Sequence, residues 1–166
     1  MPRWLDKLFG RVPTVTDWDQ LQLGMVEIEG TVRPLEVLED PVDGRRCVAL
    51  EYRAWPPSTT AGVDGAAVVG DRAFQVAVGQ AVEFLLEADG RSVLVRPQPG
   101  TDVGARHRAL AAQYGINLRT DVECIVPGDR VVVRGRVVHV TPPGGSPHRV
   151  DPHRAIIEAD QIRRRE

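Results

Sequence analysis

The chain of 166 residues is poor in cysteine, in aromatic residues and in long apolar runs. Its two cysteines, Cys47 and Cys124, are far apart and lie in patterns typical of strands, so we expect two unpaired thiols in a reducing compartment. No apolar run approaches the ~20 residues that a membrane-spanning helix needs. The first residues also lack the apolar core of a signal peptide. The sequence therefore predicts a cytoplasmic protein without a transmembrane segment.

The chain also lacks a charge excess of either sign. It has 21 basic and 23 acidic residues and a net charge of -2, so no overall field attracts it to nucleic acid or anionic lipid. All basic residues except Lys7 are arginine. Together with frequent Ala, Val, Gly and Pro, this usage is typical of a GC-rich bacterial genome. We therefore expect a bacterial protein.

Reactive and metal-binding patterns are equally sparse. The cysteines lack zinc-finger spacing, no histidine pair has zincin spacing, and no glycine-rich phosphate loop is present. His148 and His153 flank a proline-containing loop, where solvated side chains are the simpler interpretation. A Cys–His dyad forms in space rather than in sequence, but Cys47 lies in a strand pattern typical of a small buried residue. The sequence predicts no catalytic residue, no metal and no cofactor, and hence not an enzyme.

The clearest architectural signal is the valine-rich stretch 126–140. Pro127 and Gly128 favour a turn, and the run that follows favours a long strand. Val131, Val133 and Val137 fall on one face of this strand, while Arg134 and Arg136 fall on the other. Gly135 in mid-strand indicates a bulge or tight bend, as a strand needs when it wraps around a small barrel.

Other segments have the same two-residue period. Strands are expected at 25–33, 46–55, 72–78 and 155–159, a hairpin at 82–96 with Asp89-Gly90 as its turn, a loop at 56–65 and a helix at 102–114. The sequence predicts a mainly β fold, a small antiparallel OB-like β-barrel with one internal helix, and a β-sandwich is the alternative. We divide the chain into an N-terminal helical segment at 1–24, a barrel domain at 25–160 and a frayed basic tail at 161–166.

Four blocks resemble one known family in order and in sequence. They are VEIEGTVRPL at 26–35, DGRRCVALEYR at 43–53, FLLEADG at 84–90 leading to VLVRP at 93–97, and PGDRVVVRG at 127–135. They resemble the GIDE-type domain, also called BAM for "beside a membrane", of mitochondrial RING-type ubiquitin ligases and bacterial relatives. The ligases' flanking transmembrane helices and zinc-binding RING have no counterpart in this sequence. The resemblance therefore implies a non-catalytic recognition domain, which binds a protein partner or another ligand.

A second hypothesis concerns nucleic acid. Arg134 and Arg136 share a strand face that Arg96 can approach, and Tyr52 and Trp55 lie on a neighbouring predicted strand. OB folds hold single strands with basic and aromatic side chains of this kind. The acidic balance and the few aromatic residues argue against it, so we expect a protein partner rather than nucleic acid.

The N-terminal segment carries an apolar stripe that needs a surface to cover it. Trp4, Leu5, Leu8 and Phe9 share one face at helical spacing, but the segment is too short for a stable isolated helix. We expect the stripe to dock on the protein's own barrel. The alternative is that it anchors the protein to a partner or peripherally to a membrane, with a polar rim of Arg3, Lys7 and Arg11.

Overall fold

The computed structural model describes residues 12–57, 59–61, 67–69, 75–142 and 153–165. The chain forms two compact units rather than the single barrel domain expected over 25–160. The barrel unit contains Met1–Glu36, Val82–Gln98 and Pro127–Glu166. The inserted unit contains Val37–Ala81 and Pro99–Val126, and thus interrupts the barrel sequence twice.

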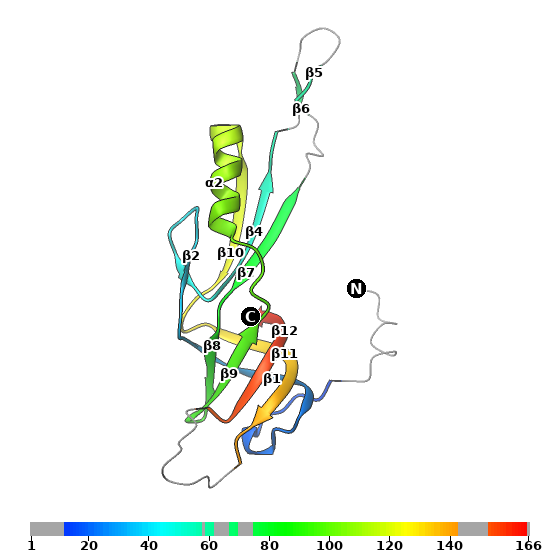
Figure 1. Ribbon diagram of the computed structural model, residues 1–166, viewed down its shortest axis with the longest axis vertical. Helices are drawn as coiled ribbons and strands as arrows, with labels where there is room; N and C mark the ends of the chain where they lie inside the picture. The colour runs from blue at the N-terminus through cyan, green and yellow to red at the C-terminus, as the bar shows by residue number, and fades with distance from the viewer. Residues whose placement is uncertain (1–11, 58, 62–66, 70–74, 143–152, 166) are drawn as a thin grey trace. The chain divides into compact units, whose positions relative to one another are not determined.

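Five strands form the barrel unit, which confirms the predicted mainly β fold with a small barrel (Figure 1). The strands are β1 (Gly24–Pro34), β8 (Phe84–Ala88), β9 (Arg91–Pro97), β11 (Arg130–Val140) and β12 (Ala155–Arg164). They close in the order β1-β11-β12-β9-β8, which decides against the sandwich alternative. Neighbouring strands are antiparallel except β12 and β9, which are parallel. The predicted antiparallel arrangement thus holds for every neighbouring pair of the barrel except β12 and β9.

Alternating side chains build the barrel core. Val26, Ile28 and Val32 of β1 are buried, as their two-residue period predicts. The β8–β9 hairpin turns at Asp89 and Gly90, whose φ angles of 50° and 73° give the primed turn that suits the twist of paired strands.

The long strand β11 has the orientation that the sequence predicts. Val131, Val133 and Val137 are buried, and Arg134 and Arg136 lie on the outer face. The pairing with β12 shifts register between Arg134 and Gly135, where the bulge is predicted. A Cβ atom on Gly135 would lie 2.2 Å from the carbonyl oxygen of Glu158, so the close approach of β12 requires glycine.

Residues 161–164 belong to a strand rather than to the frayed tail expected at 161–166. Strand β12 continues to Arg164, and its pairing with β11 reaches Val131↔Arg164. Ion pairs hold this end of the strand to neighbouring segments: Arg163–Glu27 at 3.2 Å, Arg164–Asp129 at 2.8 Å, and Arg165–Glu29. The basic residues belong to the strand because carboxylates of neighbouring elements face them.

The helical segment predicted at 1–24 is short where it is described. It is the 3-10 helix η1 (Trp18–Gln20), in which the Asp17 carboxylate accepts a 3.0 Å hydrogen bond from the Asp19 N–H. Trp18 and Leu21 are buried. The stripe formed by Trp4, Leu5, Leu8 and Phe9 lies outside the described residues.

The inserted unit is built on a three-stranded sheet of order β10-β4-β7. Its strands are β10 (Arg119–Ile125), β4 (Ala49–Trp55) and β7 (Val76–Ala81). Two small hairpins pair β2 (Leu38–Glu39) with β3 (Arg46–Cys47), and β5 (Thr59–Ala61) with β6 (Ala67–Val69). Helix α2 (Val103–Tyr114) is followed by the 3-10 turn η2 (Gly115–Asn117).

Helix α2 confirms the predicted internal helix. The Asp102 carboxylate caps it by accepting a 2.9 Å hydrogen bond from the Ala105 N–H, and Gly115 at φ 57° ends it. Val103 and Leu110 pack into one core with Leu50 and Tyr52 of β4. The helix therefore covers one face of the sheet (Figure 1).

Three features of the inserted unit differ from the sequence prediction. Strand β10 was not predicted, although Thr120, Val122 and Cys124 alternate with charged residues. Strand β5 lies within the loop expected at 56–65. Strand β7 begins at Val76 rather than at 72, and residues 72–74 lie outside the described part.

Candidate functional site

The five predicted binding residues belong to two different units. Arg96, Arg134 and Arg136 lie on β9 and β11 of the barrel unit, whereas Tyr52 and Trp55 lie on β4 of the inserted unit. The hypothesis of single-stranded nucleic acid binding placed these residues on neighbouring strands of one barrel, but they belong to different sheets.

The three arginines share the outer face of the barrel. Strand β12 lies between β9 and β11, and its Glu158 is opposite Arg96 on one side and opposite Arg136 on the other. The Cα atoms of the two arginines are thus separated by two strand spacings, or about 10 Å. Arg96 is engaged locally, because its Nε lies 3.0 Å from a carboxylate oxygen of Glu83.

Arg134 and Arg136 differ from the other arginines of this face. Arg130 pairs with Glu29 at 2.5 Å, and Arg163 pairs with Glu27, the residue opposite Arg134 in the β1–β11 register. Within the ranges that the structure describes, neither Arg134 nor Arg136 has a carboxylate within ion-pair distance. Two guanidinium groups of one rigid strand are therefore available to an anionic ligand.

The aromatic residues serve the inserted unit itself. Tyr52 is fully buried, and its hydroxyl lies 2.9 Å from Nδ1 of His107 on α2. Burial raises the pKa of Tyr52. Trp55 is partly exposed, and the guanidinium of Arg119 lies 5.5 Å from its ring centroid. Only Trp55 of the two could stack on a ligand.

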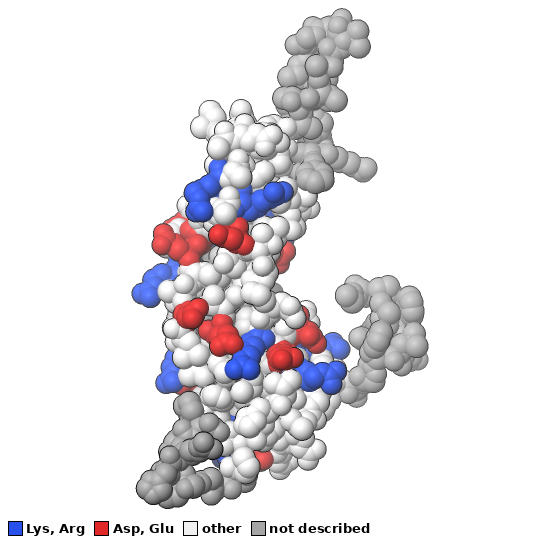
Figure 2. Space-filling view, viewed as in Figure 1, with Lys and Arg blue, Asp and Glu red and all other residues white. Residues whose placement is uncertain are grey.

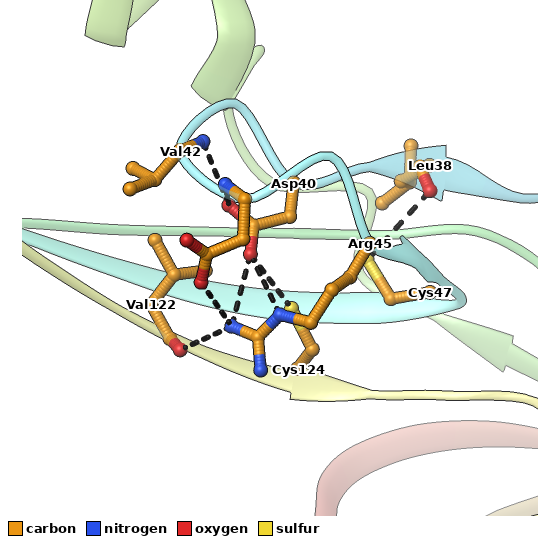
Figure 3. A network of polar contacts seen from close by, with 8 residues as sticks. Leu38, Asp40, Val42, Arg45, Cys47, Val122 and Cys124 are labelled. Atoms are coloured by element: carbon orange, nitrogen blue, oxygen red, sulfur yellow. Dashed lines mark hydrogen bonds and ion pairs between the residues drawn. The ribbon is translucent and has the colours of Figure 1, made fainter.

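Among the described residues, an enclosed polar cluster that the sequence patterns did not single out surrounds Asp40 (Figure 3). Asp40 is 1% exposed and follows β2. Its Oδ1 accepts hydrogen bonds from the N–H groups of Val42 at 2.8 Å and Asp43 at 3.3 Å. Its Oδ2 accepts one from Nε of Arg45 at 3.0 Å, and Arg45 Nη2 also donates to the Val122 carbonyl at 3.0 Å.

These contacts determine the charge state of the cluster. Burial opposes ionisation of Asp40, but hydrogen bonds from the Val42 N–H, from Arg45 and from the Asp43 N–H outweigh it and lower the pKa of the carboxyl. The hydrogen bond with Asp40 in turn raises the pKa of Arg45. Asp40 and Arg45 therefore form an ion pair at neutral pH, and this pair links the β2–β3 hairpin to β10.

Both cysteines lie beside this ion pair. The Cys124 thiol donates to Asp40 Oδ2 at 3.7 Å, and the Cys47 thiol donates to the Leu38 carbonyl at 3.8 Å. Burial, and next the negative charge that Cys124 can carry, raise the pKa of Cys47 to about 12. Burial also raises the pKa of Cys124, although Arg45 opposes the rise. Both groups remain thiols at neutral pH, a state unsuited to nucleophilic attack.

The Asp40 cluster does not offer the ligand set of a metal site. Across the described segments, no three Cys, His, Asp or Glu side chains converge as a metal ion requires.

A shallow hollow at the β8–β9 turn was not predicted from the sequence. It is lined by Thr31, Arg33, Glu87, Ala88, Asp89, Gly90, Arg91 and Ser92. Beside it, Asp19 contacts Arg91 and also Arg154, the latter at 2.5 Å. The hydrogen bond from Arg91 lowers the pKa of Asp19 despite an opposing effect of burial. The hollow thus mixes both charge signs and selects for neither.

The mixture of charges extends over the visible surface. Figure 2 shows acidic and basic side chains interspersed rather than gathered by sign. On this face the described residues form no broad basic track for a nucleic acid backbone (Figure 2), in agreement with the net charge of -2.

Comparison with known proteins adds no assignment. No model of a known protein family matches the chain, and no curated protein matches it significantly. Among the residues that the structure describes, no helix combines the length and apolar character needed to cross a membrane.

Proposed function

We propose that this chain is a non-catalytic recognition domain of a bacterial cytoplasmic protein. It binds an acidic surface of a partner protein through the outer face of β11. The observation that carries the proposal is the pair Arg134 and Arg136, which are unpaired among the described residues while Arg96, Arg130 and Arg163 are held by carboxylates. Side chains two apart on a strand point to the same side, so one partner can meet both. Guanidinium groups suit such a role because they bind carboxylates in a planar, two-pronged geometry.

Two further considerations support a binding role rather than a chemical one. The two thiols are buried and protonated, so the residues with most intrinsic reactivity serve the core. The five-stranded closed barrel with one parallel pair is compatible with an OB-type fold, and the four sequence blocks resemble the GIDE-type recognition domain.

The test compares a double variant with a matched control. Arg134→Ala/Arg136→Ala removes two charges from β11, and Arg108→Ala removes an exposed arginine of α2 that also has no ion pair within the described ranges. Each protein is immobilised and exposed to bacterial extract, and retained proteins are purified and measured for direct binding. We expect a partner whose affinity falls at least tenfold with the double variant and is unchanged with Arg108→Ala. A partner bound equally by all three proteins would contradict the role of this face.

A second candidate function is binding of single-stranded nucleic acid, which the same two arginines on a barrel strand favour. Fluorescence anisotropy of a labelled single-stranded oligonucleotide measures it directly. Binding at low salt that weakens steeply with salt would support this function, and the double variant should then lower the salt slope by roughly two. No binding at low salt would remove it. Burial of Tyr52 makes the protein-partner function the stronger one.

A further inference from the structure

The inserted unit is assembled from two chain segments, and each contributes one cysteine. Cys47 belongs to Val37–Ala81, and Cys124 belongs to Pro99–Val126. The intervening chain passes through β8 and β9 of the barrel unit. Within the inserted unit, therefore, the two segments are held together by packing and hydrogen bonds rather than by a direct chain connection.

The two thiols meet where these segments join. Cys47 ends β3 and Cys124 lies on β10, and both belong to the buried core of the inserted unit. Each thiol makes a contact at this junction: Cys124 Sγ lies 3.7 Å from Asp40 Oδ2, and Cys47 Sγ lies 3.8 Å from the carbonyl oxygen of Leu38, two residues before Asp40. Figure 3 shows both side chains beside the Asp40–Arg45 pair, which holds the β2–β3 hairpin against β10.

We propose that Cys47 and Cys124 form a reversible disulfide under oxidising conditions, which covalently joins the two segments of the inserted unit. The oxidant is a small-molecule disulfide of the glutathione class. Loop closure between distant residues reduces the freedom of the unfolded chain, so this bond is expected to stabilise the folded state.

The exchange proceeds in two balanced steps. When the hairpin opens, the Cys124 thiol, the more exposed of the two at 7%, gives up its proton, and the resulting thiolate attacks one sulfur of the small disulfide. The small disulfide bond breaks, and one small thiol leaves with that proton. The Cys47 sulfur then attacks Cys124 Sγ in the mixed disulfide, and a second small thiol leaves with the Cys47 proton. Two protein thiols are oxidised to one disulfide, and one small disulfide is reduced to two thiols.

Burial controls the rate of this reaction. Cys47 is 0% exposed and Cys124 is 7% exposed, so the oxidant reaches them only when the β2–β3 hairpin opens locally. The reaction should therefore be slow in native buffer and accelerate in urea below the unfolding transition. This dependence distinguishes a guarded pair from an exposed, constantly reactive one.

The test uses the full chain incubated with oxidised glutathione, with and without mild urea. Remaining thiols are then alkylated under denaturing conditions, and the products are analysed by intact mass and by non-reducing peptide mapping. We expect a species lighter by two hydrogen atoms, resistant to alkylation, in which the Cys47 and Cys124 peptides are linked. Its melting temperature should be higher than that of the reduced protein by about 5–15 °C. Treatment with dithiothreitol should restore the melting temperature of the reduced protein.

Variants and alternative products keep the proposal falsifiable. Cys47→Ser and Cys124→Ser should each abolish the linked species and the thermal shift. Stable glutathione adducts on both cysteines, disulfide-linked dimers, or unreacted thiols in mild urea would overturn the proposal. A linked species with an unchanged melting temperature would overturn the stabilising role of the bond.

Discussion

Val131 and Arg134 lie three residues apart on β11 and face opposite sides of the barrel wall. Val131 is 0% exposed, whereas Arg134 projects from the outer face. The alternation of valine with arginine was sufficient to predict this orientation, because a strand turns successive side chains to opposite faces. Cys47 was similarly predicted to be a small buried residue, and it is fully buried.

The orientation of β11 leads to a direct test of stability. Val131→Asp places an unpaired carboxylate inside the barrel and should lower the free energy of unfolding by roughly 3 kcal/mol or more. Arg134→Ala, on the same strand, should change it by less than about 0.5 kcal/mol. Urea unfolding measures both. Equal midpoints for the two variants would mean that the assignment of inner and outer faces is wrong.

Asp40 should make stability depend on acid pH. Because folding lowers its pKa below the ordinary value of about 3.9, its stabilisation is complete above that value and disappears as pH falls through the folded-state pKa. Asp40→Asn removes this charge and turns an amide donor towards Arg45, so it should cost about 2–3 kcal/mol at pH 7. The difference from wild type should narrow as the pH drops below 4. Urea titrations at pH 7 and pH 3 test this, and a constant difference would contradict the assigned role of Asp40.

At the scale of elements, local chemistry predicted the parts whose partners are close in sequence. The β8–β9 hairpin and α2 were predicted with their turn and cap residues, since Asp89-Gly90, Asp102 and Gly115 act within a few residues. Strand β10 escaped prediction because Thr120 and Cys124 make its alternating pattern only weakly apolar, and because its partner β4 is far away in the chain. The C-terminal part of β12 was also missed. Its arginines pair with carboxylates that are distant in sequence, Glu27 for Arg163 and Asp129 for Arg164, and a local pattern does not reveal such partners.

Two glycines of different elements provide a matched pair of substitutions. Gly135→Ala should destabilise the barrel by about 1–3 kcal/mol, since the new Cβ would meet the backbone of β12 at 2.2 Å. In Gly104→Ala of α2 the new Cβ would lie 3.3 Å from the flexible end of Arg108 and 3.5 Å from the Asp102 carboxylate, with no backbone in the way, so this change should stabilise the protein by about 0.5–1 kcal/mol. Thermal melts of both variants decide the matter, and a neutral Gly135→Ala would indicate that β11 and β12 separate easily.

At the scale of the whole molecule, the sequence predicted a barrel but not its division into two units. The strands of the barrel unit carry the clear valine-rich or alternating patterns, whereas β2 and β3 have two residues each and leave little signal. The same missed division explains why the predicted binding residues belong to two different units. Tyr52 and Trp55 belong to a strand that resembles the barrel strands in pattern but pairs with β7 and β10 instead.

The segment 1–11 provides a test on the whole protein. We expect the apolar stripe of this segment to dock on the barrel; its residues are Trp4, Leu5, Leu8 and Phe9. Deletion of residues 1–11 should then lower the melting temperature by several degrees. Differential scanning calorimetry of the truncated and complete chains measures this. Unchanged stability, accompanied by loss of co-purification with membranes or a partner, would instead support the anchoring function.

The parallel contact between β12 and β9 has a consequence for biosynthesis. β12 is the fifth barrel strand to leave the ribosome, yet it fills the position between β9 and β11. The roughly 40 residues after Ile125 take about 2–8 s to translate, and until then the β9 edge has no partner while all strands of the inserted unit are already made. Nascent chains therefore spend several seconds with an exposed, apolar strand edge, a period in which chaperones or neighbouring nascent chains on the same messenger RNA could capture it.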